Sequence, residues 1–98
     1  MEIRKTKFFT DWFEALNENV QFRVWKYIER TAQGNYSTSA PVGEGVHEIR
    51  IDFQKGYRIY YTIKGNELII LLAGSHKGDQ KKIIKIAKEI KALLGDMK

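Results

Sequence analysis

Two arginines, a histidine and a lysine in the second half of the chain have the types and spacing that could do chemistry. Arg50 and Arg58 occupy polar positions in two alternating segments, and His76 and Lys77 come soon after an apolar run. Guanidinium and ammonium groups that converge bind a phosphate and stabilise the charge that develops during its transfer. Imidazole titrates near neutral pH and can move a proton. A purely structural ion pair between Asp52 and Arg58 fits the same pattern, and the sequence leaves both interpretations open.

The two arginines share a face if their strands pair in a suitable register. Residues 46–53 and 57–63 each alternate between apolar and polar side chains, as half-buried strands do. A two-residue turn would mix the apolar and polar series across the pair, whereas a three-residue loop over residues 54–56 keeps them apart. We therefore predict the three-residue loop. The predicted pairs are Phe53–Tyr57, Ile51–Ile59, Asp52–Arg58 and Arg50–Tyr60.

A third strand is predicted at residues 68–73, which are apolar throughout. Such a run is typical of a strand that is covered on both faces, so we expect it to be central in the sheet. Gly65 and Asn66 before it suit a two-residue type II′ hairpin turn. Residues 74–78 are expected to form the polar loop that leaves the sheet.

Two N-terminal segments have the apolar spacing of amphipathic helices. The first runs from Phe8 to a break at residues 17–19, and the second is predicted to begin at an Asn19 cap and to end at Gly34. Their aromatic side chains are expected to pack against the Ile/Tyr face of the sheet. A short strand is predicted in residues 1–5.

The C-terminal segment, about residues 79–94, is predicted to be a basic amphipathic helix that is capped by Asp79 and ends at Gly95. Residues 34–45 contain three glycines and the only proline, and they predict a loop. The predicted fold class is α+β. Two N-terminal helices pack on an antiparallel sheet of three to four strands, and a basic helix ends the chain.

Length and composition restrict the class of protein. The 98 residues suit a single domain, 1–98, that can bury a core of its own. The absence of cysteine excludes disulfides and thiolate chemistry. The chain shows no metal-ligand cluster or phosphate-binding glycine loop, so no metal or other cofactor is expected. It has no signal peptide and no apolar run near the ~18 residues of a membrane span, so we expect a cytoplasmic protein with no membrane contact.

The positive charge is concentrated in the second half of the chain. Residues 1–45 hold six Lys/Arg and six Asp/Glu, and residues 46–98 hold eleven and six, so the net charge of +5 belongs entirely to the sheet and the last helix. A polyanionic partner would gain most by docking there. A lysine-rich face that keeps a small domain soluble would have the same composition.

The order of these segments resembles the RelE/ParE superfamily of bacterial toxins, and most closely its HigB-like branch of addiction module killer proteins. The motifs that carry the resemblance, after two helices and a GN loop, are GVHEIRI, GYRIYY and LLAGSHKGDQ, followed by a closing helix. It spans the chain from Phe8 to Leu93. It implies two N-terminal helices on an antiparallel sheet, and an antitoxin partner that neutralises the toxin by wrapping it.

For the site, the resemblance implies phosphate-binding roles for Arg50, Arg58 and Lys77, with His76 as the candidate general acid or base. In the members that cleave mRNA on the ribosome, such basic residues hold the scissile phosphate while the 2′-hydroxyl attacks it. Several of those members place a tyrosine or histidine near the C-terminus, and this chain has neither after Lys77. Proton transfer by His76 and charge stabilisation alone both stay open.

Two main functions remain open at this point. The first is an mRNA endoribonuclease that acts on translating ribosomes and inhibits translation, and the second is a ParE-like inhibitor that binds DNA gyrase and cleaves nothing itself. The basic sheet and the His76-Lys77 pair favour the first. A domain that only binds its antitoxin is the third interpretation.

Overall fold

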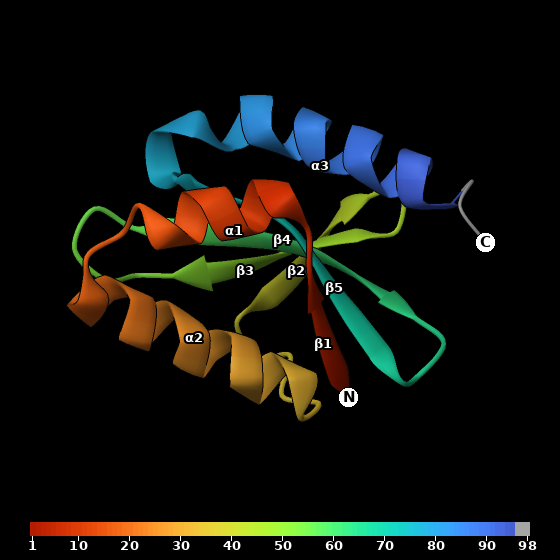
Figure 1. Cartoon of the computed structure of the whole chain (residues 1–98), viewed down its shortest axis with the longest axis horizontal. Coiled ribbons are helices and arrows are strands. Elements are labelled where there is room, and N and C mark those ends of the chain that lie inside the picture. Colours follow the sequence, from red (N-terminus) through yellow and green to blue (C-terminus); the bar gives the residue numbers. More distant parts are fainter. Residues whose placement is uncertain (96–98) are drawn as a thin grey trace.

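The computed structural model describes residues 1–95 and shows a five-stranded sheet with helices on both faces (Figure 1). In chain order the elements are β1 (Glu2–Lys5), α1 (Lys7–Glu14), α2 (Glu18–Ala32), β2 (Ser39–Gly43), β3 (Val46–Ile51), β4 (Tyr57–Lys64), β5 (Leu68–His76), a 3₁₀ turn (Lys77–Asp79) and α3 (Gln80–Gly95). The strand order is β1-β5-β4-β3-β2. None of the helices in the described part of the chain is long and apolar enough to cross a membrane.

One face of the sheet is covered by the helical hairpin of α1 and α2. Fully buried residues of this core come from both helices and from three strands: Phe9, Val20, Val24, Ile28, Ile49, Ile51, Ile59, Tyr61, Ile69 and Leu71. Trp12 and Trp25 pack against its edge. The predicted packing of the aromatic hairpin on the Ile/Tyr face is confirmed.

The opposite face is covered by α3, which buries Ala87 and Ile90 against Tyr60, Leu72 and Ala73. Strand β5 therefore has helices on both sides, as its continuous apolar run predicted. It lies between β1 and β4, so it is an interior strand. The lysines of α3 cover the outside of this second layer.

The sheet has one strand more than predicted, and it is not wholly antiparallel. The predicted N-terminal strand exists as β1, but it pairs parallel with β5. Residues 34–45, predicted to be a loop, contain strand β2, which pairs antiparallel with β3 at the sheet edge. Pro41 disguises this strand in the sequence, because proline lacks a backbone N–H and is tolerated only at edges or bulges.

The predicted register between β3 and β4 is wrong by two residues. Ile49 pairs with Ile59, and Arg50 with Arg58. A shift of two leaves every side chain on the same face, so the apolar pattern could not detect it. The loop decides the register: Gln54 and Gly56 both adopt positive φ, and the Gly56 N–H donates to the carbonyl of Phe53 at 2.9 Å.

Element boundaries differ from the prediction in three further places. Lys64 pairs with Leu68, so the β4–β5 loop has three residues and not two. Asn17, and not Asn19, caps α2, because its side chain accepts from the Val20 N–H at 3.0 Å. The polar segment after residue 73 stays in the sheet as the end of β5, with residues 77–79 in the 3₁₀ turn that precedes α3.

Candidate functional site

The two arginines of the predicted site lie directly opposite each other on neighbouring strands. Arg50 of β3 pairs with Arg58 of β4, and both point to the face that α3 covers. The Arg50 side chain is 59% exposed, whereas that of Arg58 is 7% exposed. Like charges directly opposite in a sheet destabilise it. The two guanidinium groups lean apart along the strands, since Arg50 reaches back to Glu48 and Arg58 reaches towards Asp52.

Arg58 is buried without full compensation of its charge. Its Nη1 donates to the carbonyl of Tyr57 at 3.0 Å, and its ion pair with Asp52 is long, at 3.8 Å. The Asp52 carboxylate is 88% exposed, so water screens this pair strongly. Within residues 1–95 the buried Nε of Arg58 has no hydrogen-bond partner. A buried guanidinium with an unused donor is suited to bind an oxyanion.

Lys77 joins the arginines through the β3–β4 loop. Its backbone N–H donates to the carbonyl of Gly56 at 3.3 Å. A Cβ placed on Gly56 would lie 3.3 Å from the Lys77 Cβ and 3.9 Å from Nη1 of Arg58. Gly56, at φ +80°, therefore lets the exposed Lys77 lie close to Arg58. A side chain at position 56 would lie between the two residues.

His76 lies on the other face of the sheet. It pairs with Tyr57 at the end of β5, and its ring contacts Tyr57 at 5.3 Å and Trp12 of α1 at 6.4 Å between centroids. Alternation along the strand explains this, because Ser75 points to the side of Arg58 and His76 to the side of α1. The structure thus places Arg50 and Arg58 on one face of the sheet with Lys77 beside the β3–β4 loop, and it places His76 on the other face.

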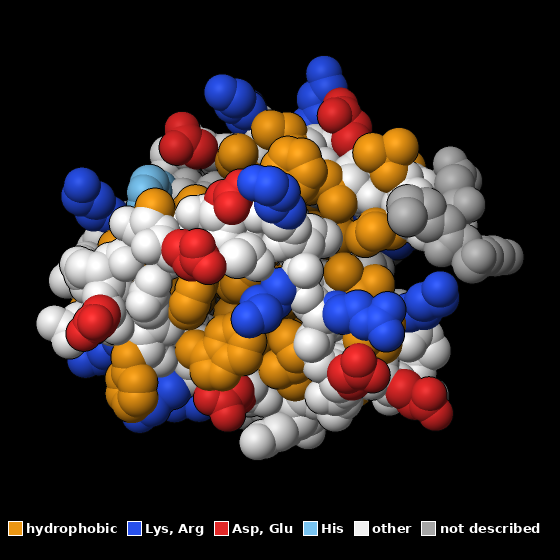
Figure 2. All heavy atoms as spheres, viewed as in Figure 1, with side chains coloured by type: hydrophobic (Ala, Val, Ile, Leu, Met, Phe, Trp, Pro, Cys, Tyr) orange, Lys and Arg blue, Asp and Glu red, His pale blue; other side chains and the backbone are white. Residues whose placement is uncertain are grey.

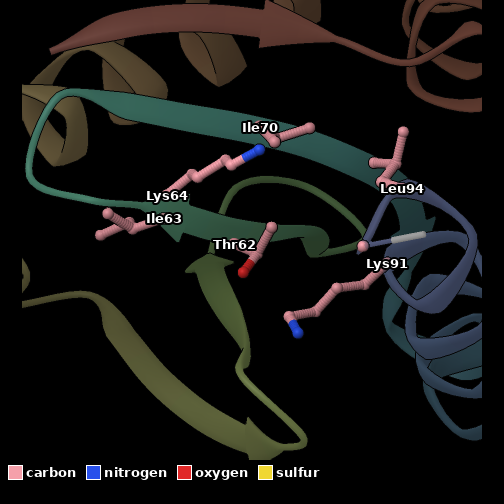
Figure 3. Close-up of a pocket in the computed structure, with 7 residues that line it drawn as sticks. Thr62, Ile63, Lys64, Ile70, Lys91 and Leu94 are labelled. Atoms are coloured by element: carbon pink, nitrogen blue, oxygen red, sulfur yellow. The ribbon is translucent and has the colours of Figure 1, made fainter. Parts of the chain in front are cut away.

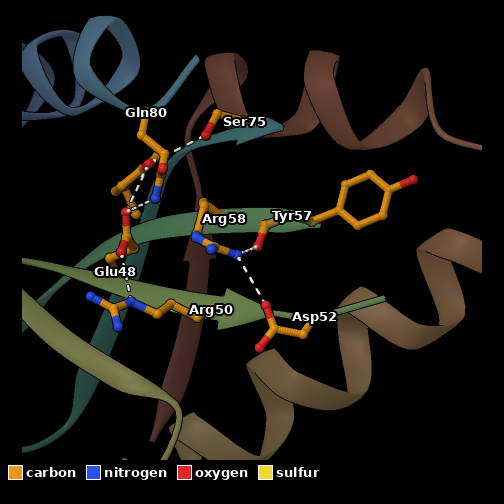
Figure 4. A network of polar contacts seen from close by, with 8 residues as sticks. Glu48, Arg50, Asp52, Tyr57, Arg58, Ser75 and Gln80 are labelled. Atoms are coloured by element: carbon orange, nitrogen blue, oxygen red, sulfur yellow. Dashed lines mark hydrogen bonds and ion pairs between the residues drawn. The ribbon is translucent and has the colours of Figure 1, made fainter. Parts of the chain in front are cut away.

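A buried carboxylate, Glu48, lies behind the arginines and did not emerge from the sequence (Figure 4). Its Oε1 accepts from the Arg50 Nε at 3.2 Å, and its Oε2 accepts from Tyr60 at 3.1 Å and from Gln80 at 3.3 Å. The Tyr60 hydroxyl also lies 3.2 Å from that of Ser75. The sequence did contain the polar series Glu48, Arg50, Arg58 and Tyr60. It could not show that Glu48 is buried, because this burial depends on α3.

Burial raises the pKa of the Tyr60 hydroxyl to about 12, and the nearby charge of Glu48 acts in the same direction. At neutral pH this hydroxyl is therefore protonated and can donate to Glu48. Tyr60 fixes the position of the carboxylate and is unsuited to accept a proton from a substrate.

The surface has one hollow beside the arginine site and another at the opposite end of β4. A pocket of about 240 Å³ adjoins Arg50 and is lined by residues 37–40 and Asp52, three of which carry hydroxyl groups. A more apolar groove of about 220 Å³ lies between the far end of the β4–β5 hairpin and the last turn of α3 (Figure 3). It is lined by Thr62, Ile63, Lys64, Ile70, Lys91, Leu94 and Gly95. No group of three or more His, Cys, Asp or Glu side chains in residues 1–95 could hold a metal ion.

Comparison with known proteins gives the family. The model of the family described as Phage derived protein Gp49-like (DUF891) matches residues 11–92. The chain belongs to this family. An uncharacterised protein of Haemophilus influenzae is 35% identical to this Gp49-like chain over 96 residues, which is 97% of each chain.

Solved structures show that this Gp49-like protein has the fold of E. coli RelE, as the resemblance in the sequence implied. A mutant of the E. coli toxin RelE in the free state matches with a TM-score of 0.73 at 12% identity, over 90% of this chain and 94% of that one. A chain of the intact E. coli RelBE toxin–antitoxin complex matches with a TM-score of 0.65 at 10% identity, over 76% and 94%. The HigB-like branch stays a prediction.

Proposed function

We propose that this chain is the toxin of a type II toxin–antitoxin pair and that it cleaves mRNA on the ribosome. The observation that carries the proposal is the buried Arg58, whose Nε is without a partner in residues 1–95 and which faces a second arginine across the strand pair. A buried guanidinium with an unused donor, which an oxyanion would satisfy, suits a phosphate ligand. The RelE-like fold and the family supply the context of a toxin.

In the proposed reaction, the 2′-oxygen of one nucleotide attacks the adjacent phosphorus and the bond to the 5′-oxygen breaks. The products are a 2′,3′-cyclic phosphate and a 5′-hydroxyl, and the proton lost by the 2′-hydroxyl is balanced by one gained by the leaving oxygen. Arg58, Arg50 and Lys77 stabilise the charge that builds up on the phosphorane. Because His76 lies on the other face, we assign the proton exchange to solvent.

We further propose an acidic, amphipathic segment of the antitoxin as the occupant of the groove at the end of α3. Its apolar lining includes Ile70 and Leu94, and Lys64 and Lys91 add positive charge (Figure 3). The excess of positive charge in residues 46–98 favours an acidic partner on this side of the sheet.

Arg58→Ala tests the ribonuclease directly. We expect the variant to lose growth inhibition, and its cleavage rate to fall about 10²- to 10³-fold, which is the cost of one lost donor to transition-state charge. Primer extension on mRNA from cells that express each variant measures the cleavage. Arg50→Ala provides a second variant, at a side chain that is 59% exposed, and Arg4→Ala on β1, 67% exposed, is the matched control.

If the wild-type protein arrests growth without cleaving mRNA, and gyrase-linked DNA breaks accumulate, the ribonuclease proposal is wrong and the ParE-like function takes its place. His76→Gln tests the proton assignment in the same assay. A general acid or base accelerates a reaction by about 10²- to 10⁴-fold. A fall in the cleavage rate of that size would show that His76 transfers the proton. We expect a smaller effect.

A further inference from the structure

We propose that the outward face of α2 is a second RNA-binding surface, which holds the substrate strand beyond the nucleotide at Arg58. The surface consists of Phe22, Arg23, Lys26, Tyr27 and Arg30, and we call it the α2 strip. It rests on the proposed ribonuclease function and extends it from a single phosphate to several nucleotides.

Each cation of the α2 strip lies over an aromatic ring. Lys26 Nζ is 4.6 Å from the centre of the Phe22 ring, and Arg30 Cζ is 5.4 Å from that of Tyr27. Arg23 Cζ lies 4.4 Å from the ring of Phe53, in the β3–β4 loop. Phe22 is 64% exposed, so its ring contributes little to the core. Rings and cations that alternate in this way form the platforms on which single-stranded nucleic acids stack.

The strip is hollowed and carries no acid in its lining. Its five residues enclose an open pocket of about 380 Å³ with three positive side chains. Figure 2 shows Lys and Arg side chains beside exposed hydrophobic ones at the lower left edge of the molecule, where the first half of α2 runs in Figure 1. The acids Glu18 and Glu29 belong to the same helix but do not line the pocket.

A chain of contacts connects the strip to the arginine site. Arg58 reaches Asp52 at 3.8 Å, the next residue is Phe53, and the Phe53 ring lies under Arg23. The β3–β4 loop is thus the shared border of the two surfaces. The exposed carboxylate of Asp52 would repel a phosphate, so we expect the strand to cross the loop at Phe53.

RNA fits the strip better than an acidic protein segment does. An acidic segment needs positive charge alone, whereas here every cation is coupled to a ring that can stack on a base.

The test is binding of fluorescein-labelled, 2′-O-methylated RNA, which cannot be cleaved because it lacks the attacking hydroxyl. Oligonucleotides of about 4 and about 12 nucleotides, within the range of single-strand binding sites, are compared by fluorescence anisotropy. The variants are Lys26→Ala with Arg30→Ala, and separately Phe22→Ala. The matched control is Lys82→Ala with Lys85→Ala, which removes two exposed charges from α3.

We expect wild-type protein to bind the longer RNA more tightly, and the α2 variants to lose this advantage while the α3 control keeps it. For the lysine–arginine variant, the slope of log K against log salt should fall by about 0.7 per lost phosphate contact, or about 1.4 in total. Phe22→Ala should weaken binding with the salt slope unchanged.

Equal affinity of wild-type protein for both lengths, or identical losses in the α2 and α3 variants, overturns the strip alone and leaves cleavage at Arg58 standing. An α2 variant that binds RNA normally but escapes neutralisation by the antitoxin would assign the strip to a protein partner, and this also overturns the inference. If the wild-type protein neither binds nor cleaves RNA, the proposed function fails with it.

Discussion

Glu48 is a carboxylate in a place where a charge is costly. It is 2% exposed and lies between the sheet and the start of α3, so its hydration must be replaced by protein donors. Arg50, Tyr60 and Gln80 supply those donors. Because Glu48 holds the Nε of Arg50, the two terminal nitrogens of that guanidinium remain available to a phosphate. We therefore interpret Glu48 as a positioning residue that acts through Arg50.

Glu48→Gln should slow RNA cleavage by a factor on the order of 10², the cost of a misplaced group at a reacting centre. The same substitution should have almost no further effect in an Arg50→Ala background, since the residue through which it acts is already gone. Single-turnover cleavage rates of the four proteins measure this coupling. Additive losses, with equal urea midpoints, would show that Glu48 acts independently of Arg50.

Tyr60 predicts how stability depends on alkaline pH. Its pKa is raised from 10.0 to about 12 in the folded protein, so between these values the folded state holds a proton that the unfolded state has lost. Stability from this group is complete below pH 10 and falls as the pH rises towards about 12. Urea unfolding at several pH values should show a shallower decline for Tyr60→Phe than for wild-type protein. Equal slopes would mean that Tyr60 does not titrate as described.

At the scale of elements, α1 is seated on β5 because one strand residue has no side chain. The indole of Trp12 lies directly on Gly74, where a Cβ would overlap the ring. This close approach brings α1 near the end of β5, beside the ring of His76. The packing of α1 against the end of β5, where the ring of His76 lies, therefore depends on a glycine.

Gly74→Ala should destabilise the protein by about 1–3 kcal/mol, the usual cost of forcing extra atoms into a packed interface. Gly78→Ala is the matched control, since a Cβ there would meet nothing within 4 Å. Urea denaturation compares the free energies of unfolding of both variants with wild type. A loss no greater at Gly74 than at Gly78 would show that α1 can shift away from β5 at little cost.

At the scale of the whole molecule, charge is distributed unequally between the two halves of the chain. The first 45 residues are neutral overall, and the remaining residues carry the entire net charge of +5. The sheet face under α3 and α3 itself thus form the positive side of the protein. Long-range attraction of an acidic partner to that side accelerates association, and salt screens it.

Association with the antitoxin should consequently slow as salt is raised. Stopped-flow measurement of the association rate constant at several salt concentrations tests this. Lys64→Ala with Lys91→Ala should flatten the dependence, whereas Lys5→Ala with Lys7→Ala, in the neutral half of the chain, should leave it nearly unchanged. An association rate constant that does not change with salt would show that the lysines of α3 only keep the protein soluble.

The sequence by itself determined the class of fold, the three helices, the strands β3, β4 and β5, and the side of the sheet that the aromatic hairpin covers. These follow from local periodicity, which is strong where apolar residues recur at every turn or every second residue. The sequence also placed Arg50 and Arg58 on one face of the sheet. A shift of the strand register by two residues leaves every side chain on the same face, so this prediction did not depend on the register.

The tertiary structure alone decided which residues meet. The β3–β4 loop, with Gln54 and Gly56 at positive φ, set Arg50 opposite Arg58 and brought Lys77 near Arg58. The strand pleat put His76 on the far face although it adjoins Lys77 in the chain. The burial of Glu48 depended on α3, which crosses a face that alternation alone described as polar. Contacts between residues distant in sequence have no periodic signature, and for this reason the site had to be observed in the fold.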